Sequence, residues 1–160
     1  MKLGEKVVLA LMALVVIGGA FSSALHVEEQ HDRDIPFYST ATPEEASKAM
    51  DIYRSNVCKR CHTMWSLQSM LQSVPAPMLD GIGSLRAENW LYEYLSSANP
   101  QQLLPSRLKK EYQMPSYAGL TDEDRHVLAK YLSSLKVQDW YLEQTKKSEY
   151  EKLTGKDAPK

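Results

Sequence analysis

Five consecutive residues, Cys58-Lys59-Arg60-Cys61-His62, constrain this chain more than any other feature of its sequence. Two cysteines separated by two residues and followed directly by histidine have the spacing by which c-type haem is attached to protein. One short turn presents two thiols to the two vinyl groups of the haem, and the imidazole of His62 then lies under the iron as an axial ligand. Its second ring nitrogen is free to donate a hydrogen bond that fixes the ring. The motif predicts one covalent haem c, bound by Cys58, Cys61 and His62.

Two other chemistries use closely spaced cysteines, and the sequence disfavours both. A zinc site takes about four cysteine, histidine or carboxylate ligands, whereas Cys58 and Cys61 are the only cysteines in the chain. A redox-active dithiol of the thioredoxin type lies beside a βαβ pattern, and no run of β-branched residues here indicates a parallel sheet. A chance occurrence of the motif stays open until a second iron ligand is identified.

The composition is typical of a globular domain. The chain has 160 residues, of which 43% are hydrophobic and 24% are charged, and its formal net charge is −1. This balance gives no general attraction to nucleic acid or to anionic lipid, so we expect no nucleic-acid partner. Two cysteines are too few for a disulfide scaffold, and the length leaves room for one domain with additional segments.

The amino-terminal segment, residues 1–25, is predicted to be a transmembrane anchor. Val7–Leu25 is nineteen residues without a charge, and a helix of that length covers about 29 Å, close to the hydrocarbon thickness of a bilayer. Lysines precede it and acidic residues follow it, so the positive-inside rule places its carboxyl side outward. A cleaved secretory signal ending near Ser22-Ser23-Ala24 is the alternative. We favour the anchor because no helix breaker interrupts the apolar stretch before its end.

The remainder of the chain divides into three parts by composition. Residues 26–41 are charged and polar and are predicted to be a linker, although Phe37 and Tyr38 have side chains able to lie against a domain. Residues 42–137 contain the haem motif and the helical patterns, and form the predicted haem domain. Residues 138–160 are a highly charged tail, which we expect to contain a peripheral helix.

Helical periodicity predicts an all-α domain. Thr42 has the properties of an N-cap, with Pro43 in the first turn and Glu45 at capping-box distance, so one helix should run from there into the haem motif. A second helix is expected over 85–97 and a final one from Thr121 to about Leu135. The intervening stretches, 75–84 and 101–113, are expected to be loops or short helical turns because they contain prolines and glycines.

Met114 is the predicted second axial ligand of the iron. A thioether is a soft, weak ligand suited to the iron of electron-transfer haem proteins, and Pro115 holds the residue before it extended. Filling a gap in the core is the ordinary use of a methionine. The rival ligands are Met64, which is too close to His62 to reach the opposite haem face; Met78, in a loop assigned to the proximal side; Met70, which is harder to exclude; and His126, on a helix.

The order of these features resembles that of class I monohaem cytochromes c over roughly residues 42–137. The matching pieces are the helix entering the haem motif, the loop 76–83 and the Met114-Pro115-Ser116-Tyr117 segment before a last helix. The resemblance implies a cytochrome c fold in which the first and last helices cross and the Pro77 carbonyl accepts a hydrogen bond from His62. It further implies that Arg86 and Trp90 contact a haem propionate. The long segment Thr63–Val74 departs from the family pattern.

With His62 and Met114 both on the iron, no coordination position remains for a substrate. We therefore expect an electron-transfer protein, or a non-catalytic haem subunit of an oxidoreductase, that carries single electrons between respiratory-chain components. The layout of one anchor, one linker and one haem domain is similar to the haem c subunits of respiratory oxidoreductases such as nitric oxide reductase or cbb3-type oxidase. The alternative is a haem enzyme or gas sensor with an open or displaceable sixth ligand.

Location and partners follow from the same features. Haem c is normally attached on the outer side of an energy-transducing membrane, so we expect a single-pass protein of the bacterial inner membrane with its haem domain in the periplasm. Basic residues flank both iron-ligand segments and predict a docking face for an acidic redox partner. These residues are Arg54, Lys59, Arg60, Arg107, Lys109 and Lys110.

Overall fold

The structure is a computed structural model that describes residues 3–30, 35–64, 74 and 76–158. The chain divides into two compact units, Met1–Ile35 and Pro36–Lys160. The first unit contains helix α1, Leu3–Gln30, with one stretch long and apolar enough to cross a membrane, Gly4–Ser22. Its described side chains are exposed.

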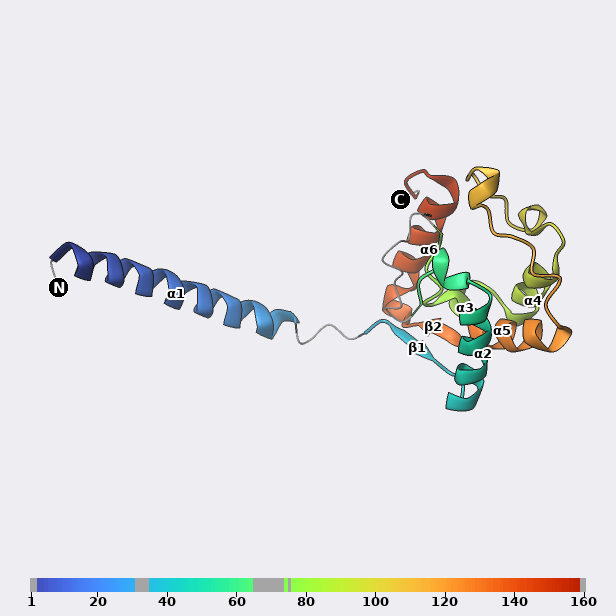
Figure 1. The fold of residues 1–160 in the computed structure, drawn as a ribbon, viewed down its shortest axis with the longest axis horizontal. Coiled ribbons are helices and arrows are strands. Elements are labelled where there is room, and N and C mark those ends of the chain that lie inside the picture. Colours follow the sequence, from blue (N-terminus) through green and yellow to red (C-terminus); the bar gives the residue numbers. More distant parts are fainter. Residues whose placement is uncertain (1–2, 31–34, 65–73, 75, 159–160) are drawn as a thin grey trace. The chain divides into compact units, whose positions relative to one another are not determined.

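The second unit is helical with one small sheet (Figure 1). Its α-helices are α2 Pro43–Ser55, α3 Ile82–Leu85, α4 Glu88–Ser96, α5 Asp122–Ser134 and α6 Asp139–Thr154. Three short 3₁₀ helices are η1 Cys58–Arg60, η2 Pro100–Gln102 and η3 Lys110–Tyr112. Strands β1 Phe37–Ser39 and β2 Leu135–Val137 pair antiparallel, with Phe37 opposite Val137.

Helix α2 begins at the predicted cap. The hydroxyl of Thr42 accepts a hydrogen bond from the backbone N–H of Glu45, and the Glu45 carboxylate accepts one from the backbone N–H of Thr42. This reciprocal pair satisfies two N–H groups that the first helical turn would otherwise leave unbonded. Thr121 caps α5 in the same position, accepting from the N–H of Asp124. Both helices therefore begin where the sequence predicts.

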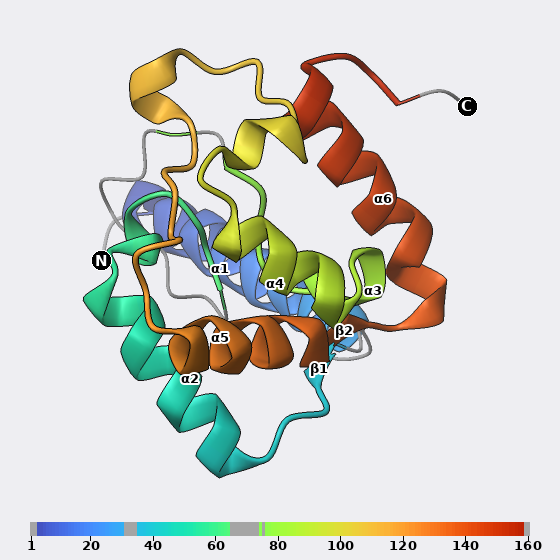
Figure 2. The same ribbon diagram turned by 90° about the vertical axis from the view of Figure 1, so that its right-hand side faces the viewer.

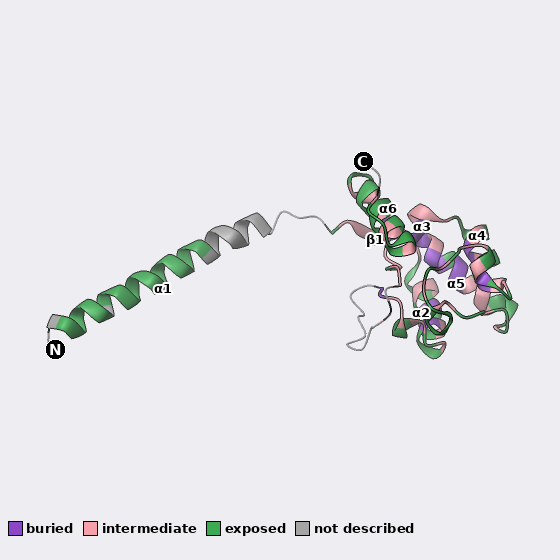
Figure 3. Cartoon of the chain, turned by 90° about the horizontal axis from the view of Figure 1, so that it is seen from above, coloured by how far each residue is buried: buried purple, intermediate pink, exposed green. Residues whose placement is uncertain are grey.

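Helices α2, α4 and α5 meet in one apolar core, in which α5 packs against both of the others (Figure 2). Their buried segments face the interior of the domain (Figure 3). Ala49 of α2 and Ala129 of α5 are completely buried, and small side chains at these positions allow helix axes to approach closely. Leu91, Leu95, Leu128 and Leu132 fill the same cluster. The crossing of the first and last helices of the domain is the arrangement implied by the family resemblance.

The two-stranded sheet was not predicted. Strand β1 lies inside the range 26–41 that the sequence assigns to a linker, and α1 extends into that range as far as Gln30. The N–H of Gln138 donates to the carbonyl of Pro36, and the Phe37 ring packs edge-on against Tyr141. Three-residue strands carry too little periodicity to be recognised in a sequence, and their pairing spans about a hundred residues of chain.

Helix α3 corrects the expected loop over 75–84. Its four residues, Ile82–Leu85, form one helical turn, and α4 then begins at Glu88 instead of at Leu85. Long-range bonds hold this turn: Lys136 Nζ donates to the Gly83 carbonyl at 2.7 Å, and the N–H of Val137 donates to the Ser84 hydroxyl at 3.0 Å. A single helical turn is too short to be stable alone. The tertiary hydrogen bonds therefore stabilise α3.

The ion pair of Glu45 leads us to expect that the folded protein loses stability in acid. Its pair with Lys130 of α5, at 2.6 Å, is the main cause that lowers the Glu45 pKa to about 2, with the Thr42 hydrogen bonds adding to it. A pKa below the unfolded-state value means that the contribution is complete above about pH 4.5 and is lost as the pH falls toward 2. We expect Glu45→Gln, which keeps the cap geometry, to flatten the decline of Tm over this interval. Thermal unfolding of both proteins across the acid range checks this, and parallel curves would contradict it.

Candidate haem site

The haem motif begins with a sharp reversal of the chain at the end of α2. Val57 has φ 63°, a left-handed conformation that is costly for a β-branched residue. It leads into the 3₁₀ turn η1, in which the N–H groups of Cys61 and His62 both donate to the carbonyl of Cys58. The turn thus places both thiols and the imidazole within one tight loop of five residues. Strain of this kind is retained where the surrounding structure fixes it, which is common at functional sites.

The imidazole of His62 is oriented by two neighbouring segments. Its Nδ1 lies 2.9 Å from the carbonyl oxygen of Pro77, so Nδ1 carries the proton and Nε2 is available as a ligand. Burial lowers the pKa of His62, which favours the neutral form that binds metal. The hydroxyl of Tyr53 donates to the His62 carbonyl at 2.8 Å. The Pro77 contact is the hydrogen bond that the family resemblance implies.

A largely apolar pocket opens in front of this motif. Its lining residues come from the haem motif, from α4 and α5, and from the chain between α4 and α5. Cys58, Cys61, His62 and Met114 all line it. The donor set fits one haem: two thiols for covalent attachment, an imidazole and a thioether from separate chain segments, and apolar side chains around them.

Met114 reaches the pocket from the segment that follows η3. Gln113 before it has extended backbone, and the Gln101 side chain donates to the Met114 carbonyl at 2.9 Å. The Tyr117 hydroxyl lies 3.4 Å from the carbonyl of Asn56, which ties this segment to the end of α2. Burial raises the pKa of Tyr117, so its phenol stays protonated at neutral pH.

The rival ligands occupy other positions. Met64 is fully buried in the core, Met78 is half exposed on the proximal loop, and neither lines the pocket that contains His62. His126 is on the exposed side of α5, with its Nδ1 2.9 Å from the carbonyl of Asp122. Met70 lies outside the described residues, as does most of the segment Thr63–Val74. Met114 is thus the described methionine that shares a pocket with the haem motif.

Trp90 and Arg86, the two residues expected to contact a haem propionate, differ in whether they line the pocket. Trp90 lines the pocket and stacks on Tyr94 with ring centroids 5.1 Å apart. Arg86 packs over the Trp90 ring, and its guanidinium pairs with Glu149 of α6 at 3.0 Å. Burial raises the pKa of Glu149, while Arg86 opposes that rise. Arg86 therefore has a protein partner in this structure, and its contact with a propionate stays a prediction.

Helix α6 supplies pocket residues that the sequence analysis missed. Glu149, Lys152 and Leu153 line the pocket, and Arg107 Nε donates to the Lys152 carbonyl at 3.2 Å near the end of α6. The tail was expected only to contain a peripheral helix. The inward positions of α6 recur at helical spacing, but several are polar, as at Thr145 and Glu149, so hydrophobic periodicity does not mark them.

A helical domain with a CxxCH turn, an oriented histidine and a methionine that lines the same pocket is typical of a small c-type haem protein. The family model described as Cytochrome c matches residues 46–136, more than half of the chain. The chain belongs to the cytochrome c family, and its cofactor is covalently attached haem c. No curated protein and no solved structure matches it.

Proposed function

We propose that this protein is a membrane-anchored monohaem cytochrome c that carries single electrons as a subunit of a respiratory membrane oxidoreductase. Membership of the cytochrome c family supports haem-based electron transfer. The proposal of His62 and Met114 as the two iron ligands rests on one observation. The two residues line the same pocket from separate chain segments. When bound, the haem supplies one-electron redox chemistry, and the chain's own residues set its potential through ligation and burial.

Attachment, iron ligation and orientation of the haem would each fall to different residues. Cys58 and Cys61 would attach it through their thiols, His62 and Met114 would ligate its iron, and the Pro77 carbonyl keeps the imidazole in one tautomer. Apolar side chains of α4 and α5 exclude water from the pocket. With both side chains on the iron, no coordination position would remain for a substrate.

Carbon monoxide separates this function from the alternative. A haem enzyme or gas sensor has an open or easily displaced sixth position, so its reduced form binds carbon monoxide readily. We expect the reduced protein to bind it poorly because Met114 occupies that position. Optical titration of the reduced protein with carbon monoxide measures this, and ready saturation would favour the enzyme or sensor.

The membrane location is proposed from helix α1. Its apolar stretch passes the length and composition expected of a membrane span, and a signal sequence passes the same test. The backbone continues as helix beyond Ser22-Ser23-Ala24, the candidate cleavage site, to Gln30. Because signal cleavage sites lie after the helical region of a signal, this continuity supports a retained anchor. The periplasmic side of the bacterial inner membrane is proposed for the haem domain because haem c is normally attached on that side.

A dedicated complex and a free shuttle differ in what co-purifies. We expect affinity purification of the tagged protein from native membranes in mild detergent to recover large membrane subunits in stoichiometric amounts. Mass spectrometry of those chains would identify the reaction that the complex catalyses. Recovery of the haem protein alone would instead favour a tethered carrier that moves electrons between complexes.

The basic docking face is proposed from the exposed cations beside the pocket. Lys59 and Arg60 lie between the two haem cysteines, and Lys109 and Lys110 precede the Met114 segment. All four are exposed, and within the described part of the chain none has a carboxylate at ion-pairing distance. Unpaired cations around a haem edge attract an acidic redox partner and steer its approach.

Charge reversal tests the docking face without a known partner. We expect the double substitution Lys59→Glu with Arg60→Glu to slow reduction of the anion ferricyanide about tenfold at low salt, with the difference vanishing at high salt. A cationic cobalt oxidant should show the opposite change. The matched control reverses Lys146 and Lys147, exposed on α6. Equal effects of the two double substitutions would contradict a local docking face.

A further inference from the structure

The segment carrying Met114 joins α5 through residues 115–120, which form neither helix nor strand. We propose that Arg125 is a positioning residue for Met114, which it holds at the iron by binding the carbonyl groups of Ala118 and Leu120. The inference rests on the axial ligation proposed above and adds to it the part of the protein that maintains the ligand. Arg125 itself touches neither the pocket nor the haem motif.

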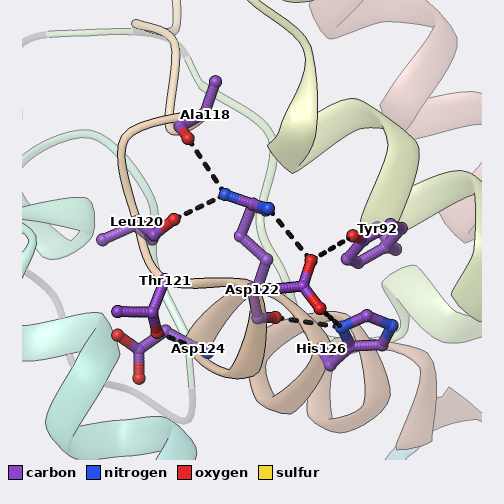
Figure 4. Close-up of polar contacts among 8 residues, drawn as sticks. Tyr92, Ala118, Leu120, Thr121, Asp122, Asp124 and His126 are labelled. Carbon is purple, nitrogen blue, oxygen red and sulfur yellow. Dashed lines mark hydrogen bonds and ion pairs between the residues drawn. The ribbon is translucent and has the colours of Figure 1, made fainter.

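The Arg125 guanidinium joins the end of this segment to the start of α5. Its Nη1 donates to the Ala118 carbonyl at 2.9 Å and also to the Leu120 carbonyl, while Nη2 donates to the Asp122 carboxylate at 3.0 Å (Figure 4). The side chain is only 15% exposed. Charge-assisted hydrogen bonds from a shielded guanidinium are about twice as strong as neutral ones. Two backbone carbonyls are therefore fixed relative to α5.

Two further side chains hold Asp122, the carboxylate that Arg125 binds. The Asp122 carboxylate accepts a hydrogen bond from the Tyr92 hydroxyl of α4 and lies 3.3 Å from Nδ1 of His126. The Tyr92 bond is the main cause that lowers the pKa of Asp122, so this carboxylate stays ionised. The Tyr92 and His126 rings pack together with centroids 4.1 Å apart (Figure 4). The packed pair of α4 and α5 thus supports the guanidinium.

The position of Arg125 within α5 is by itself unfavourable for a cation, so other contacts must stabilise the side chain there. Arg125 stands one turn from the amino end of α5, where the helix dipole disfavours a cation. Its Nε is buried, with no hydrogen-bond partner in the described part of the chain. The ion pair with Asp122 in the preceding turn and the bonds to the loop carbonyls together offset these costs.

Other contacts hold the chain at Met114 and just after it. Gln101 donates to the Met114 carbonyl, and Ser116, which lies between Met114 and the carbonyls that Arg125 binds, donates to the carbonyl of Ser97, at 2.9 and 2.8 Å. The Tyr117 hydroxyl lies 3.4 Å from the carbonyl of Asn56. Loss of Arg125 frees residues 118–120 and leaves the segment held by these contacts alone. The segment can then move away from the iron while the remainder of the pocket stays folded, so a competing ligand should replace the thioether more easily.

Imidazole binding to the ferric holoprotein measures this displacement. We expect Arg125→Gln to bind imidazole at least about tenfold more tightly than the unsubstituted protein, since a competing ligand no longer works against two charge-assisted bonds. The near-infrared absorption that reports a methionine–iron bond should weaken in the same variant. The matched control is Lys130→Gln on the same helix, because Lys130 pairs with Glu45 of α2 and not with the loop.

Two further variants keep the test decisive. Arg125→Lys retains the charge and should restore part of the ligand retention, whereas Tyr92→Phe removes only the support of Asp122 and should shift imidazole affinity in the same direction by less. Unchanged imidazole affinity and absorption in Arg125→Gln, even with a lower Tm, would reduce Arg125 to a structural residue. If Met114→Ala itself keeps the near-infrared absorption, the ligand assignment fails, and that result is distinct from failure of the Arg125 proposal.

Discussion

Replacing Met114 by alanine is expected to convert this protein from an electron carrier into one that binds external ligands. The thioether is a weak ligand that raises the potential of haem iron relative to other axial ligands. Its loss opens the sixth position, so the reduced variant should bind carbon monoxide readily and its potential should fall by a sizeable part of the roughly 0.8 V that axial ligands span. Optical titration with carbon monoxide and a potentiometric titration measure the two effects.

The control for this substitution is Met78→Ala. Met78 is half exposed on the proximal loop and does not line the pocket of His62, so its loss should change neither carbon monoxide binding nor the potential. A Met114→Ala protein that still excludes carbon monoxide would mean that another side chain occupies the position. Met70, outside the described residues, is then the next residue to substitute.

Chemistry that depends on a few adjacent residues was predictable from the sequence. The CxxCH turn, the cap at Thr42 and the cap at Thr121 are each specified within six residues, and the structure has both caps. The cofactor is confirmed through the family match. The role of Met114 stays a prediction that its place in the pocket supports, because the iron itself would be the test.

Features made by distant segments were not predictable. Strands β1 and β2 pair across the whole haem domain, and each is too short for a recognisable pattern. Glu149 of α6 reaches Arg86 only because the chain folds back on α3 and α4, and nothing local marks either residue as a partner of the other. Arg125 looks like a surface cation in the sequence. Only the structure shows its guanidinium turned toward the loop.

Both sides of the haem site depend on α5 and the strand that follows it. In the proposed haem site, the methionine side depends on α5 through the Met114 segment, whereas the histidine side depends on the carboxyl end of α5, where α3 packs and the Pro77 loop ends. Packing defects at this junction should therefore disturb the histidine side of the iron. Gly83 of α3 lies at this junction, directly against the backbone of α5.

The substitution Gly83→Ala is expected to destabilise the fold severely. A Cβ at Gly83 would lie 2.0 Å from the carbonyl oxygen of Ser133 and 2.9 Å from that of Leu132. Overpacking of a core costs about 1–3 kcal/mol when side chains can move, and here the obstacle is the backbone of α5, so we expect about 3 kcal/mol or more. Displacement of α3 would also disturb the loop whose Pro77 carbonyl orients His62.

Urea unfolding of the holoprotein measures the loss, and Gly119→Ala is the matched control. No atom lies within 4 Å of a Cβ at Gly119, and its φ is not in the left-handed range, so alanine there should be neutral or slightly stabilising through the unfolded state. Equal unfolding midpoints for the two variants would mean that α3 can move away from α5 without cost. That outcome would also remove the reason to expect the proximal histidine to depend on this contact.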